Sequence, residues 1–218
     1  MLLRNLIAAL MLLVVSSCTH FKPAPVQNTV QESRAAVTHI LYGQRSCSAF
    51  HIGGGKFITA AHCFGEDLGG QIGEVRMIDE RNFQYFPKVV KYSVEKDLVL
   101  LLSPDFKGRA LELFDGSVPL GMEVISMGYP GYYDLNFQFE HGYVKDVFEY
   151  EGVEMVVSEE SAYSGESGGP AISTVNGKVI GMVDAGAELI QWYRFPTHLH
   201  VSLSLFVSAR EIKAFLAK

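Results

Sequence analysis

The chain has 218 residues, of which 48% are hydrophobic and 19% charged, and its formal net charge is −6. This balance is typical of a globular protein, and the length allows one compact domain or two small ones that share an interface. Because the net charge is negative and basic runs are lacking, nucleic-acid binding is not expected.

The first residues predict an export signal. Arg4 precedes an unbroken apolar run from Leu6 to Val15, which is too short to span a membrane as a resident helix but suits a signal-peptide core. The run Val15-Ser16-Ser17-Cys18 then resembles a bacterial lipobox, whose cysteine receives a lipid. We therefore expect a signal peptide over residues 1–17, a lipidated Cys18, and an exported lipoprotein that is anchored to a membrane and faces the periplasm or the cell exterior. The alternative is a plain secretory peptide in which Cys18 is incidental.

A flexible tether is expected over residues 18–35, because the prolines, amides and serine there follow no apolar period and cannot bury enough surface to offset their ordering entropy. The folded domain is expected over residues 36–218. The turn-rich segment from Gly108 to Pro119 predicts the crossing between a first half, about 36–112, and a second half, about 113–218.

The three cysteines are informative because their number is odd. If Cys18 carries a lipid, Cys47 and Cys63 remain as a pair. An exported protein meets an oxidising compartment, where such a pair can form a disulfide. A closed loop of this length stabilises the fold by roughly 3 kcal/mol in the chain-entropy model.

Short apolar runs between turn residues predict many β-strands. The expected strands are Ser48–Ile52, Lys56–Ala60, Val75–Ile78, Val89–Val94, Leu98–Leu102, Val124–Met127, Gly142–Val147, Glu154–Val157, Ala171–Val175 and Lys178–Val183. The continuous apolar run Leu98–Leu102 suits a strand buried on both faces. Asn176 and Gly177 separate the last two strands and predict a hairpin.

The end of the chain has a different pattern. Residues Ser208 to Glu211 fit a capping box, and Ile212, Phe215 and Leu216 recur at helical spacing. The sequence therefore predicts about a dozen short strands and one C-terminal helix, which favours a sandwich or barrel architecture.

Three motifs that carry chemistry follow in the order His, Asp, Ser: ITAAHC around His62, KDLVLL around Asp97, and SGESGGP around Ser167. Together they resemble the chymotrypsin/trypsin-like serine proteases, in which such motifs hold the general base, the orienting aspartate and the nucleophile. The resemblance extends from Val37 to Lys218. It implies an all-β fold of two packed six-stranded antiparallel β-barrels with a C-terminal helix, with His62 and Asp97 on the first barrel and Ser167 on the second.

The chemistry requires these residue types. A serine hydroxyl is a poor nucleophile at neutral pH and needs a base within hydrogen-bond reach. A histidine can take that proton and return it to the leaving amine, while a carboxylate fixes the tautomer and stabilises the imidazolium. The expected reaction is hydrolysis of a peptide bond in a protein or peptide substrate through an acyl-enzyme, with no metal and no cofactor.

Two further features follow from the resemblance. The backbone N–H groups of Gly165 and Ser167 are expected to form the oxyanion hole that stabilises the tetrahedral intermediate. A cysteine beside the catalytic histidine pairs, in this family, with one fifteen residues before that histidine. Cys63 and Cys47 occupy these positions around His62, which agrees with the pairing reached from the cysteine count.

The segment from Gly181 to Gly186 resembles the strand that lines the substrate cleft, so Asp184, Ala185 and Gly186 are assigned to substrate binding. Ala185 stands where tryptophan is common, which predicts a more open cleft. Asp184 stands where a serine often hydrogen-bonds the triad aspartate. Asp184 therefore points away, is coupled to Asp97 through the repulsion of like charges, or orients His62 in place of Asp97.

Ser161 lies six residues before the nucleophile, at the floor of the specificity pocket by resemblance. A serine there argues against a strong preference for Arg or Lys and is compatible with apolar, aromatic or acidic side chains. His198 and His200 fall on another possible pocket wall or on a surface strand, and without an evident third ligand their spacing predicts no metal site. Glu166 replaces the usual aspartate, and with no activation cleavage motif evident, zymogen activation is not expected.

Two other functions are alternatives to a serine protease. One is a catalytically silent surface lipoprotein that uses the protease fold as a binding module, against which the complete set of His62, Asp97 and Ser167 argues. The other is an esterase-like hydrolase, which shares the G-x-S-x-G spacing but carries its residues in the order Ser, Asp, His. The sequence leaves the oligomeric state open.

Overall fold

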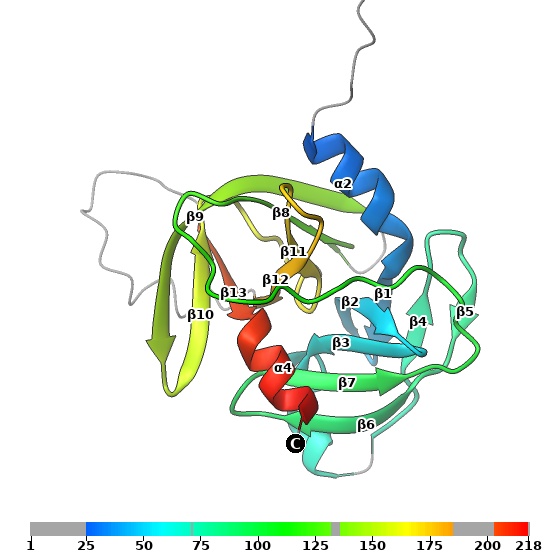
Figure 1. Cartoon of the computed structure of the whole chain (residues 1–218). Helices are drawn as coiled ribbons and strands as arrows, with labels where there is room; N and C mark the ends of the chain where they lie inside the picture. The colour runs from blue at the N-terminus through cyan, green and yellow to red at the C-terminus, as the bar shows by residue number, and fades with distance from the viewer. Residues whose placement is uncertain (1–24, 71, 132–135, 185–202, 218) are drawn as a thin grey trace, which may run out of the picture.

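The computed structural model describes residues 25–70, 72–131, 136–184 and 203–217 (Figure 1). Two β-structures make up most of this part, with one helix before them and one after. The strands of the first structure are β1 (Val37–Tyr42), β2 (Arg45–Gly53), β3 (Lys56–Ala60), β4 (Arg76–Ile78), β5 (Gln84–Tyr85), β6 (Lys88–Ser93) and β7 (Leu98–Leu102). Those of the second are β8 (Glu123–Gly128), β9 (Gln138–Tyr150), β10 (Val153–Ser158), β11 (Pro170–Ser173), β12 (Val179–Asp184) and β13 (Ser204–Ser208).

The first structure, here called the first sheet, is an antiparallel sheet of seven described strands in the order β5-β4-β1-β2-β3-β7-β6. It is curled, with β5 and β6 at its two edges. The resemblance implied a closed six-stranded barrel here, whereas the described strands form a curled sheet of seven, which includes β1 and the two-residue strand β5 that the apolar runs did not predict. Strand β7 lies between β3 and β6 and is almost entirely buried, as its continuous apolar run predicted.

The second structure, here called the second barrel, closes in the order β10-β13-β12-β11-β8-β9. Buried side chains fill its interior, among them Val124, Val156, Ile180 and Phe206. The predicted hairpin joins β11 to β12, and Gly177 adopts the positive φ of 68° that its turn requires. The chymotrypsin-like fold predicted from the sequence is confirmed.

Helix α4 (Ala209–Ala217) confirms the predicted C-terminal helix. The N–H of Glu211 donates a 3.3 Å hydrogen bond to Ser208 Oγ, which satisfies one of the free donors at the start of the helix. The helix buries Ile212 and Phe215 in the main core. Its last turn lies over β6 of the first sheet, so α4 connects the second barrel to the first sheet (Figure 1).

Of the tether expected over residues 18–35, the part from residue 25 onward is helical, and residues 18–24 lie outside the described residues. Helix α2 (Pro25–Ser33) and a 3₁₀ turn, η1 (Arg34–Ala36), occupy the end of this segment. Val26 and Val30 form an apolar pair one helical turn apart, and both pack against the main core. Polar residues on the same segment are also covered, since Thr29 and Ser33 are buried.

Two short 3₁₀ helices, η2 (Ala61–Cys63) and η3 (Gly65–Gly69), follow β3. Within the described ranges, no helix is long and apolar enough to cross a membrane. The predicted signal peptide and the lipidated Cys18 lie outside the described residues and stay predictions, as does the division of the chain into domains.

Candidate active site

The pairing of β3 with β7 brings His62 and Asp97 together. These antiparallel strands pair from Lys56 opposite Leu102 to Ala60 opposite Leu98. His62 follows the end of β3 and Asp97 precedes the start of β7, so both residues lie at the same end of this pair of strands. A backbone hydrogen bond of 3.1 Å from Ala61 N–H to the Asp97 carbonyl joins the two chain segments there.

The Asp97 carboxylate accepts two hydrogen bonds from His62. The ring Nδ1 lies 2.8 Å from Oδ2, and the backbone N–H donates to Oδ1 at 2.7 Å. Asp97 reaches this position with φ at 52°, a left-handed conformation that only a few per cent of non-glycine residues adopt. Asp97 thus holds the imidazole through one oxygen and the His62 backbone through the other, while 46% of the His62 side chain is exposed and open to a reactant.

A second carboxylate, that of Asp184, lies beside this pair. One oxygen of Asp184, one of Asp97 and a ring nitrogen of His62 all lie within 4.8 Å of one another. Burial by itself lowers the pKa of His62, but the Asp97 hydrogen bond and the negative charges of Asp97 and Asp184 outweigh it. Together with the opposing charge of Arg45, these effects leave the pKa of His62 above its usual value. Asp184 therefore does not point away, and Asp97 still holds the ring.

The loop that carries Ser167 docks on the first sheet through its backbone. The N–H of Ser48 in β2 donates a 2.8 Å hydrogen bond to the Ser167 carbonyl. A Cβ atom on Gly168 would lie 2.4 Å from Thr59 Oγ1 and 2.2 Å from the Ser48 carbonyl oxygen, so only glycine fits here. Since Thr59 lies three residues before His62, this close approach places the Ser167 loop against the segment that leads to the histidine.

The second barrel holds the same loop from the other side. The Gly168 N–H donates to the Val183 carbonyl, and the Val183 N–H donates to the Gly169 carbonyl, both at 2.8 Å. Val183 directly precedes Asp184 in β12, and β12 packs against β3 of the first sheet. The Ser167 loop, Asp184 and the His62–Asp97 pair therefore meet where the two β-structures touch.

The peptide unit between Ser164 and Gly165 has a fixed direction. The Ser164 carbonyl accepts a 2.9 Å hydrogen bond from Gly131 N–H, and the Gly165 carbonyl accepts one of 2.8 Å from Ser48 Oγ. Because the carbonyl and N–H of a trans peptide point in opposite directions, the Gly165 N–H is directed away from Gly131. Gly165 has φ at 104°, and a Cβ there would lie 2.5 Å from the Tyr129 carbonyl oxygen.

Two buried acids, Glu160 and Glu166, lie shortly before Ser167 in the chain. Burial raises the pKa of Glu166 to about 7, although its carboxylate accepts a 2.9 Å hydrogen bond from Tyr163 N–H. Burial likewise raises the pKa of Glu160 to about 8, and the charge of Glu166 adds to this effect. Glu166 is thus buried in the protein, and within the described residues it forms no ion pair with a cation.

The predicted disulfide is confirmed. Cys47 in β2 and Cys63 in η2 are joined, with their Cα atoms 6.3 Å apart. Arg45 of the same strand donates a 2.7 Å hydrogen bond from Nη1 to the His62 carbonyl. The disulfide and this hydrogen bond fix the backbone on the C-terminal side of His62, and the bonds of Ala61 N–H and His62 N–H to Asp97 fix it on the N-terminal side.

The remaining predicted site residues are less constrained. Ser161 lies, partly exposed, in the loop before Ser167, next to the buried Glu160. Ala185, Gly186, His198 and His200 lie outside the described residues.

The sequence analysis missed two residues of the site, Ser48 and Glu160. Ser48 is fully buried at the junction of the two β-structures, where a hydroxyl needs partners. Its place directly after Cys47 was the available signal, because the disulfide brings that strand beside His62. Glu160 had no comparable signal, since the acidic pair Glu159-Glu160 is typical of an exposed turn.

The comparisons with known proteins agree with this geometry. The profile of the trypsin-like peptidase domain family matches residues 47–182, and the chain belongs to this family. The match includes the motifs around His62, Asp97 and Ser167. The comparison with curated proteins found no similar sequence.

Among solved structures, the chain is similar to the Rv3671c protease of M. tuberculosis. The active form is 21% identical, with a TM-score of 0.72 over 90% of this chain and 86% of that one. The inactive form is 22% identical, with a TM-score of 0.72 over 90% and 95% of the two chains. An inactive serine-to-alanine mutant of the same protease is 21% identical, with a TM-score of 0.71 over 90% and 92%. At this identity the likeness establishes the fold.

Proposed function

We propose that this protein is a serine endopeptidase in which Ser167 is the nucleophile, His62 the general base and Asp97 the residue that orients the base. The observation that carries the proposal is the double hydrogen bond between His62 and Asp97, made at the face where the Ser167 loop docks. Membership of the trypsin-like peptidase family supports the same class of reaction.

The hydrogen bond to Asp97 defines the protonation of the ring. When Nδ1–H donates to Asp97 Oδ2, Nε2 keeps its lone pair and accepts the proton of the Ser167 hydroxyl. Ser167 Oγ then attacks the substrate carbonyl carbon, and the proton passes from His62 to the leaving amine as the acyl-enzyme forms. Water then attacks the acyl carbon while His62 takes its proton, and His62 returns that proton to Ser167 Oγ as the acyl–oxygen bond breaks and the carboxylic acid is released. The N–H groups of Gly165 and Ser167 stabilise the oxyanion in both steps.

Labelling by a fluorophosphonate probe tests this proposal directly. The purified protein, kept with helix α2 because that helix packs on the core, is compared with the Ser167→Ala and His62→Ala variants. Labelling of the wild type alone, together with cleavage of a protein substrate, is the expected result. A folded, disulfide-bonded wild type that does not label rejects the proposal and favours the silent binding module.

The preference for substrates is part of the proposal. By resemblance, Ser161, Asp184, Ala185 and Gly186 contact the substrate, and the serine at position 161 disfavours Arg and Lys as the residue before the cleaved bond. A library of peptide substrates that differ at this residue measures the preference. Dominant cleavage after Arg or Lys contradicts the assignment of Ser161 to the pocket floor.

We also propose that the protein is exported and anchored to a membrane through a lipid on Cys18. The apolar run and the lipobox-like sequence support this. Metabolic labelling with a fatty acid in a bacterial host, followed by membrane fractionation, is the test. The wild type is expected to carry label in the membrane fraction, and the Cys18→Ser variant to lose both; equal behaviour of the two contradicts the anchor.

A further inference from the structure

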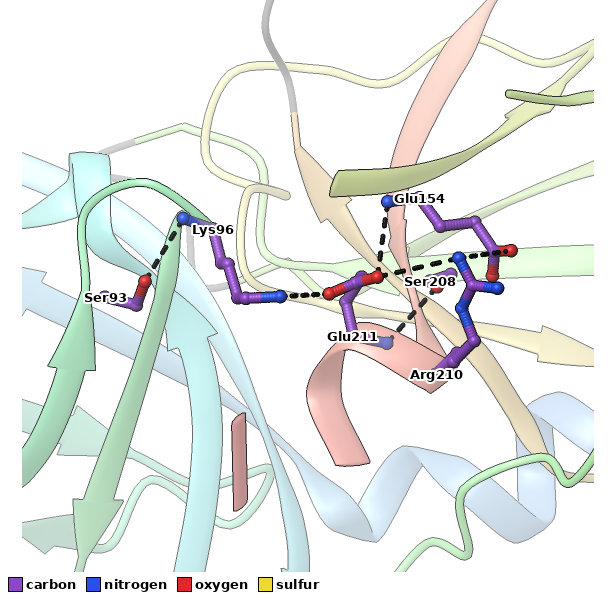
Figure 2. A network of polar contacts seen from close by, with 6 residues as sticks. All are labelled: Ser93, Lys96, Glu154, Ser208, Arg210 and Glu211. Carbon is purple, nitrogen blue, oxygen red and sulfur yellow. Dashed lines mark hydrogen bonds and ion pairs between the residues drawn. The ribbon is translucent and has the colours of Figure 1, made fainter. Parts of the chain in front are cut away.

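An ion pair joins the turn that carries Asp97 to the C-terminal helix. Lys96 lies in the turn between β6 and β7, and its Nζ pairs with the carboxylate of Glu211 in α4 (Figure 2). Only 9% of the Glu211 side chain and 22% of the Lys96 side chain are exposed. The backbone N–H of Lys96 also donates a 3.3 Å hydrogen bond to Ser93 Oγ, which closes the turn.

The Glu211 carboxylate is held on its other side by the second barrel. The Glu154 N–H in β10 lies 3.5 Å from Glu211 Oε1, and the Arg210 guanidinium lies 3.8 Å from the same oxygen. Arg210 is itself paired with the Glu154 carboxylate at 3.0 Å (Figure 2). In this network Ser93 and Lys96 belong to the first sheet, and the other residues belong to the second barrel and α4. The Lys96–Glu211 ion pair is therefore the contact of this network that joins the two β-structures.

The position of Lys96 makes this bond relevant to the reaction. Asp97 is the next residue, and its φ of 52° is adopted within the same turn. The turn is narrow, because Asp97 N–H donates a 3.2 Å hydrogen bond to the Val94 carbonyl. A displacement of Lys96 therefore moves the backbone of Asp97, whose carboxylate must stay within hydrogen-bond reach of both the ring and the N–H of His62.

We propose that Glu211, acting through Lys96, is a positioning residue for Asp97, and that this ion pair keeps Asp97 aligned with a nucleophile carried by the other β-structure. The inference rests on the proposed function, since it assumes that His62, Asp97 and Ser167 act together. A buried ion pair that loses one partner leaves an uncompensated charge, so either single substitution is expected to displace the turn. A displacement of about 1 Å at catalytic groups lowers rates by up to roughly 100-fold.

The test compares Lys96→Met, Glu211→Gln and the double variant with the wild type. For each, the kcat and KM for a peptide substrate and the fluorophosphonate labelling rate are measured, and the pKa of His62 is followed by NMR titration. The single variants are expected to lose on the order of 10- to 100-fold in kcat with little change in KM. The double variant is expected to lose no more than either single one, because both residues act through one bond. The pKa of His62 is expected to fall, since a displaced Asp97 stabilises the imidazolium less.

Lys91→Met is the matched control. Lys91 also reaches from β6 to α4, where its Nζ donates to the Phe215 carbonyl and lies 4.9 Å from the centre of the Phe215 ring. It shares the strand and the helix with the proposed pair but does not precede Asp97. We expect Lys91→Met to lower the melting temperature while kcat and the pKa of His62 keep their wild-type values. Lys96→Arg, which keeps the cation, is expected to restore most of the kcat that Lys96→Met loses.

Three outcomes overturn the inference. In the first, folded Lys96→Met and Glu211→Gln keep the wild-type kcat and His62 pKa. In the second, Lys91→Met loses as much kcat as Lys96→Met, which makes general docking of the helix the cause. In the third, the wild type neither labels nor cleaves peptides, which rejects the proposed function and this inference with it; only the first two leave the protease assignment intact.

Discussion

The hydroxyl of Ser48 donates a 2.8 Å hydrogen bond to the carbonyl of Gly165, across the junction of the first sheet and the second barrel. The same hydroxyl accepts a 2.9 Å hydrogen bond from Tyr129 N–H. One buried side chain thus holds the peptide unit that follows Gly165, a proposed oxyanion-hole donor, against the backbone of Tyr129. The arrangement of this site depends on contacts between the two β-structures as well as on His62, Asp97 and Ser167.

Replacing Ser48 by alanine is expected to destabilise the protein and slow its reaction with fluorophosphonate. The substitution leaves a buried carbonyl and a buried N–H without their partner, which costs about 1–3 kcal/mol for each group left unsatisfied. Chemical denaturation and labelling rates measure the two effects. Ser173→Ala is the control, because Ser173 is equally buried in β11 and its hydroxyl accepts a 3.3 Å hydrogen bond from Val175 N–H within the same hairpin. A Ser48→Ala protein with a normal labelling rate contradicts the role in orienting Gly165.

Replacing Asp184 by asparagine is expected to shift the pH dependence of activity to lower pH. The negative charge of Asp184 raises the pKa of His62, so its removal lets the imidazole become neutral, and therefore act as a base, at lower pH. The acidic limb of kcat/KM against pH measures the shift.

The sign for stability follows from the same linkage. A histidine whose pKa is raised on folding stabilises the native state below the unfolded pKa of about 6.5, and this stabilisation disappears as the pH rises through the folded value. Asp184→Asn removes part of it at acidic pH. Asp105→Asn, an exposed substitution in the turn after β7, is the control and is expected to leave both curves unchanged. An unaltered acidic limb for Asp184→Asn means that the Asp184 charge does not act on His62.

Replacing Gly168 by alanine is expected to separate the nucleophile loop from the first sheet. The new Cβ would lie 2.2 Å from the Ser48 carbonyl oxygen, which no side-chain rotation relieves. We expect loss of labelling and a large fall in the melting temperature. Gly177→Ala is the matched control: its φ of 68° is also positive, but no atom lies within 4 Å of the new Cβ. That variant is expected to lose only the roughly 1–2 kcal/mol of a left-handed alanine, and equal effects at the two glycines contradict the close approach.

Replacing Glu160 by glutamine is expected to change how stability depends on pH. Because burial raises the pKa of Glu160 to about 8, the native state retains a proton that the unfolded chain releases near pH 4.5. The unfolding free energy therefore decreases as pH rises between these values. Glu160→Gln removes this contribution, so its stability relative to the wild type is expected to increase from pH 5 to pH 8 in denaturant titrations. Glu159→Gln, an exposed neighbour, is the control; parallel curves for Glu160→Gln and the wild type refute a buried, protonated Glu160.

Local patterns were sufficient for much of the fold. The strands β3 and β7 were predicted with their observed bounds, because each is an apolar run that ends at polar or turn residues. Helix α4 was predicted from its cap and spacing. Strand β1 was missed because its alternation includes the buried polar residues Thr38 and His39, and helix α2 was missed because two valines are a weak apolar period.

The sequence by itself determined the family, the three catalytic candidates and the Cys47–Cys63 disulfide. These short motifs and the cysteine spacing are local in the chain, and few other kinds of site require the same combination. Only the tertiary structure decided that Asp184 lies beside His62, that Ser48 orients Gly165, and that Glu211 reaches Lys96. Each of these contacts joins residues that are far apart in the chain, and whether they meet depends on how the second barrel docks on the first sheet. No local pattern encodes that docking, since it results from packing that involves both β-structures at once.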